Sequence, residues 1–477
     1  MYTPLIGRRL LDRANARDGL NRSPAEFFDE VFFPLFFGND RYLMTAGNSK
    51  FGQLVNNRKK HEAAAQKEGR PWDDAERSRL REIALTDFHG VATDATEPQS
   101  HLVLGGYARG SDGTTSGQVT GIDHQATADE VYLSWIGAAS GAGVAGGVVL
   151  LIEHEEVLDA ILEGWSLYRD VLTAPNNLKA NQIETWNGQW LRHRFSARYR
   201  PDDPTSFIHG LINTKKTPYN IETVSWARLV FSLGRQIGDQ PVPAYVYSLG
   251  QTNTTLGFIP LHLGATGILR ESYTTLRGFY RSLFGDAAVA VEPDRLDEVY
   301  DAGLGFKRAC EEGAIGLHTL RPAKLETFLL DGKNKQPRPA LPADAQTPLL
   351  YQTWILAMLG NQKKDLYERA AETAEMLLSF ETGAIGGKMN LKKEVKAALA
   401  ATTLSSLIDS ATVISESVQD GSKANFSNEE IEETLDTLDA LVRAALDLSP
   451  ERLRLFLALL RFQVALLRGK SLHATAS

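Results

Sequence analysis

The sequence predicts an α+β protein, in which a mixed α/β N-terminal body precedes an all-helical C-terminal bundle. Two features predict this division. Short apolar runs bounded by glycine and polar turn residues occur at 131–136, 148–152 and 242–249, and such runs are typical of buried strands. Beyond residue 347 the apolar residues recur at helical spacing instead.

Length and composition narrow the class of protein. The 477 residues are 43% hydrophobic, which is enough for several domains with buried cores. A single cysteine, Cys310, rules out an intrachain disulfide and fits a reducing cytoplasm. The formal net charge of -8 argues against a free-standing, non-specific nucleic-acid binder but permits local basic patches. No apolar stretch matches a membrane span, so we expect a cytoplasmic protein without a membrane partner.

The body is predicted to cover residues 1–218. Its phenylalanine pairs at 25–37 must be buried, and the charged segment 59–85 is expected to be helical with a break near Gly69-Arg70-Pro71. The apolar spacing predicts a further helix at 155–172. The other predicted elements are extended: strands at 101–107, 118–122, 131–136 and 148–152, the last two around a glycine-rich turn, and an aromatic strand at 183–200.

Residues 219–332 are predicted to continue the body, with a strand at 242–249 and helices at 224–237, 266–283, 296–312 and 322–330. Three prolines mark 333–346 as a linker before a helical bundle at 347–477. Ser427 and Glu430 form a capping-box pattern, and Ser449-Pro450 begins the last helix. Because that helix is apolar on nearly every side, it is expected at the centre of the bundle or in a subunit interface.

The sequence contains few signs of catalysis. None of the ten histidines has metal-ligand spacing, and the chain contains neither a Walker A nor a GxSxG motif. Gly141, Gly143 and Gly146 match GxGxxG, but the residues that follow are typical of a strand, whereas a dinucleotide site requires a helix there. A glycine-rich turn explains the motif better. We therefore expect a non-enzymatic protein with no cofactor and no metal, in which Cys310 is a buried structural thiol.

A polar and basic stretch at 46–60 is the first candidate for contact with nucleic acid. Its amide and lysine side chains can bond base edges, and Gly47 and Gly52 would permit close approach. The candidates for reading a DNA motif are Asn48, Lys50 and Gln53, and those for the phosphate backbone are Asn56, Asn57, Arg58, Lys59 and Lys60. The alternative is an ordinary polar loop followed by a basic helix start.

A second candidate stretch is 179–200, where arginines recur at every other position: Arg192, Arg194, Arg198 and Arg200. In a strand these side chains share one face, beside Trp186 and Trp190, and could follow a phosphate backbone. The alternative is a solvated strand face. Arg192 and Arg194, with Lys215 and Lys216 of a later basic turn, are the backbone candidates, and Gln118 of the polar loop 114–118 is a further candidate for motif recognition in a minor groove.

Three runs also carry a family likeness: EVFFPLFFGNDRYLMTAGNSKFGQ, TSGQVTGIDHQATADEVYLSWIGAASGAGVAGG and IETWNGQWLRHRF. They resemble the large subunits of type I CRISPR effector (Cascade) complexes of the A/B-like branch, over roughly residues 25–200. The resemblance implies a non-catalytic subunit in antiviral defence, which recognises the protospacer-adjacent motif (PAM) on duplex DNA and helps to unwind it. Guide–target pairing in the R-loop would then supply sequence specificity.

The resemblance also implies partners. These are crRNA, double-stranded target DNA, the backbone, handle-binding and small subunits of the complex, and a helicase-nuclease recruited in trans. The C-terminal bundle would hold the displaced strand. The codons of Gly386-Gly387-Lys388 can form a purine-rich ribosome-binding signal before Met389, so residues 389–477 are also a candidate for a separately made small subunit. Two glycines that simply end a helix are the alternative.

Two other classes of function stay open at this point. One is an enzyme on an unrecognised α/β scaffold, with its site near the glycine-rich segment 137–147. The other is an oligomeric scaffold that binds no nucleic acid and uses the apolar last helix as its interface.

Overall fold

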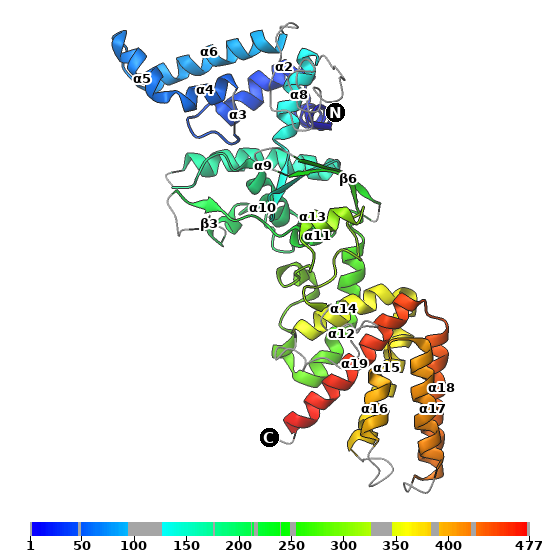
Figure 1. The fold of residues 1–477 in the computed structure, drawn as a ribbon. Helices are drawn as coiled ribbons and strands as arrows, with labels where there is room; N and C mark the ends of the chain where they lie inside the picture. Colours follow the sequence, from blue (N-terminus) through cyan, green and yellow to red (C-terminus); the bar gives the residue numbers. More distant parts are fainter. Residues whose placement is uncertain are drawn as a thin grey trace. The chain divides into compact units, whose positions relative to one another are not determined.

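The computed structural model describes residues 2–45, 49–93, 126–174, 177–210, 212–213, 218–238, 240–248, 254–325, 346–382, 391–420 and 426–474 (Figure 1). The chain forms two compact units. The first comprises Met1–Leu263 and Gly305–Ile315, and the second comprises Gly264–Leu304 and Gly316–Ser477. This division falls inside 219–332, the segment predicted as one continuation of the body. The predicted strands at 101–107 and 118–122 lie outside the described residues.

The first unit begins with a group of helices around an aromatic core. Phe37 stacks on Phe51 at 4.7 Å between ring centroids, and Phe28 stacks on Phe88 at 4.9 Å. All the phenylalanines of 25–37 are buried, as predicted. The helices are α1 (Tyr2–Asp18), α2 (Pro24–Phe27), the π-helix η1 (Phe28–Phe32), α3 (Phe33–Phe37), α4 (Lys50–Asn56), α5 (Arg58–Lys67), α6 (Asp74–Thr93) and α8 (Ala128–Ala138). The interruption between α5 and α6 confirms the predicted break.

Helix α8 corrects the predicted strand at 131–136. The Thr127 side chain accepts a hydrogen bond from the Glu130 N–H at 3.2 Å, and the Glu130 carboxylate accepts one from the Thr127 N–H at 2.8 Å. This capping box begins a helix in which every residue from Val131 to Ala138 is buried. Because all its faces are buried, the run has no amphipathic period that could distinguish a helix from a strand.

Helices α1 and α8 approach each other closely through two glycines. A Cβ atom on Gly7 would lie 2.0 Å from the Leu133 carbonyl oxygen, and one on Gly137 would lie 1.9 Å from the Thr3 carbonyl oxygen. Real Cβ atoms do not approach backbone atoms this closely, so only glycine permits this packing.

A four-stranded antiparallel sheet with the order β1-β2-β5-β6 completes the first unit. Strand β2 confirms the prediction at 148–152, and β5 confirms the one at 242–249. Gly146 and Gly147, with φ of 101° and 71°, form the turn between β1 and β2, so the GxGxxG match belongs to a hairpin, with no helix after it. The remaining elements are β1 (Ala142–Val144), β2 (Val148–Ile152), α9 (Glu155–Thr173), α10 (Ile183–Arg194), the 3-10 helix η3 (Ser206–Gly210), β3 (Ile212–Asn213), β4 (Asn220–Ile221), α11 (Trp226–Leu233), β5 (Val242–Ser248), β6 (Thr254–Leu261) and α13 (Phe306–Glu311).

The regular elements in the described part of the second unit are all helices, with one isolated bridge between Ala302 and Pro322 in the irregular segments between them. Its elements are α12 (Ala265–Phe284), the 3-10 helices η4 (Asp286–Val289) and η5 (Pro293–Glu298), α14 (Gln346–Leu359), the 3-10 helix η7 (Gly360–Gln362), α15 (Lys363–Thr382), α16 (Lys392–Leu399), α17 (Leu404–Gln419), α18 (Asn428–Leu446) and α19 (Pro450–Ala474). The helix predicted at 296–312 is divided between η5 and α13. Of the helix predicted at 322–330, residues 322–324 are not helical, Leu325 is in a 3-10 turn, and residues 326–330 lie outside the described residues. Residues 333–345 of the predicted linker and Met389 lie outside the described residues.

Helix α19 is the buried helix of the bundle. It packs against α14, α15 and α16, and its residues Leu453, Phe456 and Leu460 are buried. The predicted capping box is present, since the Ser427 hydroxyl accepts from the Glu430 N–H at 3.2 Å. The α+β fold with a helical C-terminal region is therefore confirmed. In the described part of the chain no helix has the length and apolar character to cross a membrane.

The lone cysteine lies in α13 and is 4% exposed. Burial raises the pKa of the Cys310 thiol to about 11. The thiol therefore stays protonated and unreactive at neutral pH, in agreement with the predicted structural role.

Two glycine substitutions, one expected to destabilise the first unit and one expected to stabilise it, test the described helix contact. Gly137→Ala should lower the free energy of unfolding of the first unit by about 2 kcal/mol or more, because the new methyl group collides with backbone atoms of α1. Gly90→Ala, at an exposed position in the last turn of α6 with no atom near its Cβ position, should raise it by about 0.5 kcal/mol through helix propensity. Urea unfolding followed by tryptophan fluorescence measures both, and a stable Gly137→Ala protein would contradict the described helix contact.

Candidate nucleic-acid interface

Two arginines hold the end of α3 and the residues that follow it, up to Arg41. The guanidinium of Arg169, on α9, donates from Nε to the Leu35 carbonyl at 2.7 Å and from Nη1 to the Arg41 carbonyl at 2.8 Å. Arg41 in turn donates to the carbonyls of Leu172 and Leu178. Burial lowers the pKa of Arg169 to about 10, so it stays charged at neutral pH. The loop between α3 and α4 is therefore tied to the end of α9.

Helix α4 places the first candidate residues on the surface. The Ser49 hydroxyl caps the helix by accepting from the Gly52 N–H at 3.2 Å, and Phe51 and Gly52 are buried on the inner side. Gln53 and Asn56 are exposed and Lys50 is half-buried. The stretch after Ser49 is thus a helix rather than a loop, and Gly52 serves packing and capping rather than a tight turn. Asn48 lies outside the described residues.

The first turn of α5 is the most basic part of this surface. Arg58, Lys59 and Lys60 are exposed, and no ion pair holds them among the described residues. This turn contains no acidic residue, and Asn57 at the N-cap makes no side-chain capping bond. A helix N-terminus already carries partial positive charge, so three cations there raise the local potential further. An anion such as a phosphate would be stabilised at this position.

From Lys50 to Lys67 the chain carries five basic residues and one acid. We call the exposed residues Gln53 and Asn56 to Lys60, together with the half-buried Lys50, the α4–α5 surface. The structure brings these predicted residues together on two consecutive helices. Phosphate contacts and base-edge contacts need this combination of cations and amides.

The second candidate stretch, 179–200, does not form the predicted strand. Residues 183–194 form helix α10, not a strand, and residues two apart in a helix point about 200° apart, so Arg192 and Arg194 do not share a face. Trp186 and Trp190 are 1% and 0% exposed and therefore cannot stack on a nucleic acid. Their indole N–H groups donate to the carbonyls of Gly164 and Ala160. The predicted arginine stripe is wrong.

Residues 183–194 form a helix instead of the predicted strand because this helix packs directly on β1. A Cβ atom on Gly188 would lie 2.2 Å from the Gly143 carbonyl oxygen, and the buried Asn187 amide donates to the carbonyls of Ala139 and Gly141 at 2.8 and 3.0 Å. These tertiary contacts outweigh the strand preference of its aromatic residues. Lys215 and Lys216, predicted near Arg192 and Arg194, and the motif candidate Gln118 lie outside the described residues.

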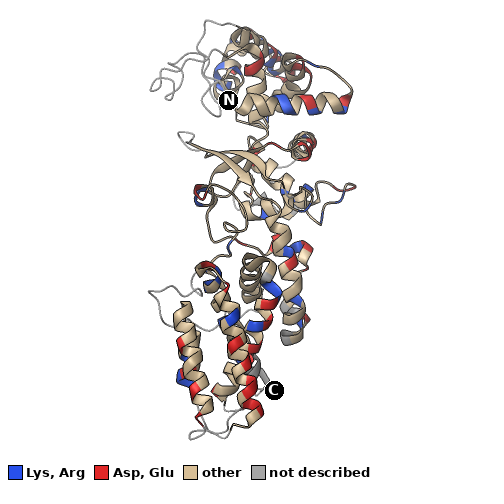
Figure 2. Cartoon of the chain, turned by 90° about the vertical axis from the view of Figure 1, so that its right-hand side faces the viewer, with Lys and Arg blue, Asp and Glu red and all other residues tan. Residues whose placement is uncertain are grey.

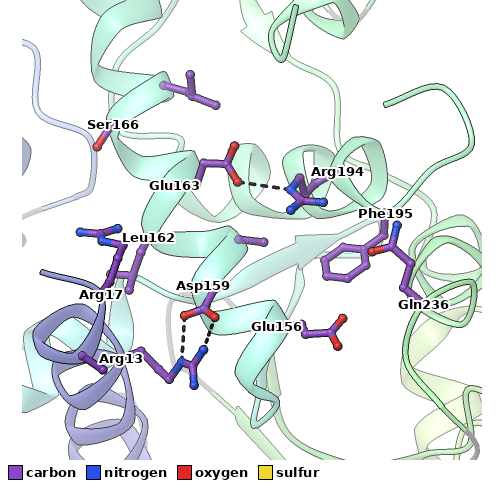
Figure 3. A pocket seen from close by; sticks show the side chains of 13 residues that line it. Arg13, Arg17, Glu156, Asp159, Leu162, Glu163, Ser166, Arg194, Phe195 and Gln236 are labelled. Carbon is purple, nitrogen blue, oxygen red and sulfur yellow. Dashed lines mark hydrogen bonds and ion pairs between the residues drawn. The ribbon is translucent and has the colours of Figure 1, made fainter. Parts of the chain in front are cut away.

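Arg194 belongs to a groove between α1 and α9 in which Arg13 and Arg194 each face a carboxylate (Figure 3). Its Nε donates to Glu163 at 3.2 Å, and its guanidinium lies 4.6 Å from the centre of the Tyr199 ring. Arg13 on α1 donates from Nε to Asp159 at 2.9 Å. Because each of these cations faces a carboxylate, the groove offers little net attraction to a polyanion. Arg194 is therefore a poorer candidate for a phosphate contact than the residues of α5.

A triad that no sequence motif indicates links three helices. His89 Nε2 lies 3.0 Å from Asp29 Oδ1, and His89 Nδ1 lies 2.6 Å from the Tyr132 hydroxyl. Burial raises the pKa of Tyr132 to about 12, and this side chain is only 3% exposed. The hydroxyl is therefore protonated and inaccessible, which suits a structural link between η1, α6 and α8 better than nucleophilic catalysis. In the described residues, no group of three or more His, Cys, Asp or Glu side chains could hold a metal ion.

The histidine between the two arginines yields a pH test. Burial, and secondly the charge of Arg192, lower the pKa of His193 to about 4. The unfolded chain binds this proton more tightly, with a pKa near 6.5, so stability is complete above that pH and falls as the pH drops from about 6.5 to 4. Between pH 7.5 and pH 5, protonation of His193 should lower the unfolding free energy of the unmodified protein by about 2 kcal/mol. His193→Phe should abolish this part of the decrease.

Urea unfolding at the two pH values measures this loss. The control is His318→Phe, which exchanges an exposed histidine of the second unit. The assignment fails if His193→Phe retains the full pH dependence of the unmodified protein.

Comparison with known proteins adds no assignment to this geometry. No protein-family model matches the chain, and no curated protein sequence or solved structure is significantly similar to it. The function of the chain must therefore be inferred from its own residues.

Proposed function

We propose that the chain is the non-catalytic large subunit of a crRNA-guided type I CRISPR effector complex in the cytoplasm. In this proposal it recognises a short motif on duplex DNA, helps to open the duplex and holds the displaced strand. The observation that carries the proposal is the α4–α5 surface, where exposed cations, without ion pairs in the described part of the chain, adjoin exposed amides. The sequence runs that resemble such subunits include the first part of this surface, up to Gln53.

The division of labour within the surface follows from its chemistry. Arg58, Lys59 and Lys60 would contact phosphates, because their charge is sequence-independent. Lys50 and Gln53 would face base edges, since lysine and glutamine can donate to acceptors in a groove. Such a small surface binds weakly alone, so the crRNA and the other subunits would supply most of the affinity.

The helical bundle is charged unevenly, which limits where it could hold a strand. Helix α18 carries six acids and one arginine, and acidic residues are frequent along the helices of the bundle (Figure 2). With α15 it lines a groove that includes Glu372, Glu375 and Glu433. This groove would repel phosphate. Helix α16 carries exposed lysines at 392, 393 and 396, and it is the better candidate within the bundle for contact with the displaced strand.

The salt dependence of DNA binding tests the phosphate contacts. Lys59→Ala/Lys60→Ala should weaken binding to a blunt duplex and reduce the slope of log K against log salt by about 2, one for each phosphate that a lysine no longer neutralises. The control is Lys307→Ala/Lys364→Ala, which removes two exposed lysines of α13 and α15 that lie outside the proposed contacts and should leave the slope unchanged. Fluorescence anisotropy of a labelled duplex measures both slopes. Equal slopes for the first variant and the unmodified protein would remove the α5 contacts from the proposal.

The assembly itself is tested by co-purification. The full chain, expressed with its genomic neighbours and purified through a tag, should emerge in a stable complex that contains a short RNA of uniform length. Isolation as an RNA-free monomer or homo-oligomer would contradict the proposal and favour the scaffold alternative. Nucleotide binding by the isolated chain would favour the enzyme alternative.

A further inference from the structure

A pocket of about 70 Å³ opens beside the α4–α5 surface, between α4, α5 and α6. Its apolar walls include Leu54, Val55, Leu80 and the Trp72 side chain. This is room for several water-sized groups and hence for part of a planar ring. Apolar walls with a few polar groups are typical of sites for small organic groups.

The polar side of the pocket carries an excess of positive charge. Asp40 forms ion pairs with two arginines of α6, at 3.0 Å from Arg77 Nε and 2.7 Å from Arg81 Nη1, and Arg77 also pairs with Asp74. Arg58, from the α4–α5 surface, also lines the pocket and has no ion pair among the described residues. Three cations are thus matched by two carboxylates, so the pocket favours a ligand with oxygen or nitrogen acceptors over a purely apolar side chain.

Trp72 supplies a second observation that points to a ligand. Its indole Nε1 is buried and has no hydrogen-bond partner among the described residues. A buried N–H without an acceptor is unfavourable, and a small rotation of the ring would let an acceptor in the pocket satisfy it. The indole also offers a face on which an aromatic ring can stack.

We propose that this pocket receives one unpaired nucleobase from the nucleic acid bound across the α4–α5 surface. The inference rests on the proposed function and adds the ligand class of a specific cavity. A nucleobase has a flat apolar face for Trp72 and Val55 and acceptors for the donors, and the backbone phosphate of its nucleotide would pair with Arg58 at the pocket. Strand opening would be assisted because a captured base cannot re-pair.

Photocrosslinking tests the proposal. Oligonucleotides with a single 5-iodouracil, as single-stranded DNA, single-stranded RNA and duplex DNA, are irradiated with the full chain at saturating protein, and the adduct is mapped by peptide mass spectrometry. We expect an adduct at Trp72, strongest with the strand type that the pocket receives. Val55→Trp fills the pocket from a position that is 47% exposed, so folding is preserved. It should abolish the adduct at saturation and weaken binding by about fivefold or more.

The control, Val413→Trp, makes the same exchange at a position that is 46% exposed on α17 and should leave adduct and affinity unchanged. If the unmodified chain binds the oligonucleotides without an adduct at Trp72, or if Val55→Trp retains the adduct, the base pocket is wrong while the proposed function stands. If the unmodified chain binds no nucleic acid either alone or in the complex with which it co-purifies, the proposed function fails as well.

Discussion

The half-buried arginine pair Arg41 and Arg169 is the constraint on which the α4–α5 surface depends. Together they bond carbonyls near the ends of α3 and α9, which helix geometry leaves without partners. The loop that carries Asp40 and Tyr42 lies between those bonds, so the cations of α4, α5 and α6 are held against a fixed framework. Guanidinium groups suit this task because several donors in a rigid plane can satisfy several carbonyls at once.

The charge of the chain is distributed in a way that its total conceals. The net charge of -8 includes the acids of α18, while the segment from Lys50 to Lys67 is strongly basic. Exposed charges further apart than roughly 10 Å are screened at moderate salt, so an acidic helix elsewhere has little influence on a local phosphate contact. An acidic total is therefore compatible with a nucleic-acid interface, and it also limits non-specific binding to other polyanions.

The sequence predicted the fold class, the strands β2 and β5, the buried phenylalanines and the capping box at Ser427, because each has a local signature. It failed where burial on all sides removes periodicity, as in α8, and where packing overrides strand preference, as in α10. The exposed residues of α4 and α5 could be selected from their type and clustering alone. Trp72, Arg77 and Arg81 could not, because only the packing of α6 against α4 brings them next to Arg58.

The burial of Cys310 has a practical consequence. Since the chain has one native thiol and it is shielded within α13, a cysteine introduced at an exposed position would be the preferred target of maleimide reagents. Pairs of fluorophores or spin labels, one in each compact unit, could then be attached without first deleting a native residue. Distance measurements by energy transfer or electron spin resonance would report how the two units move when a guide RNA or a duplex is added.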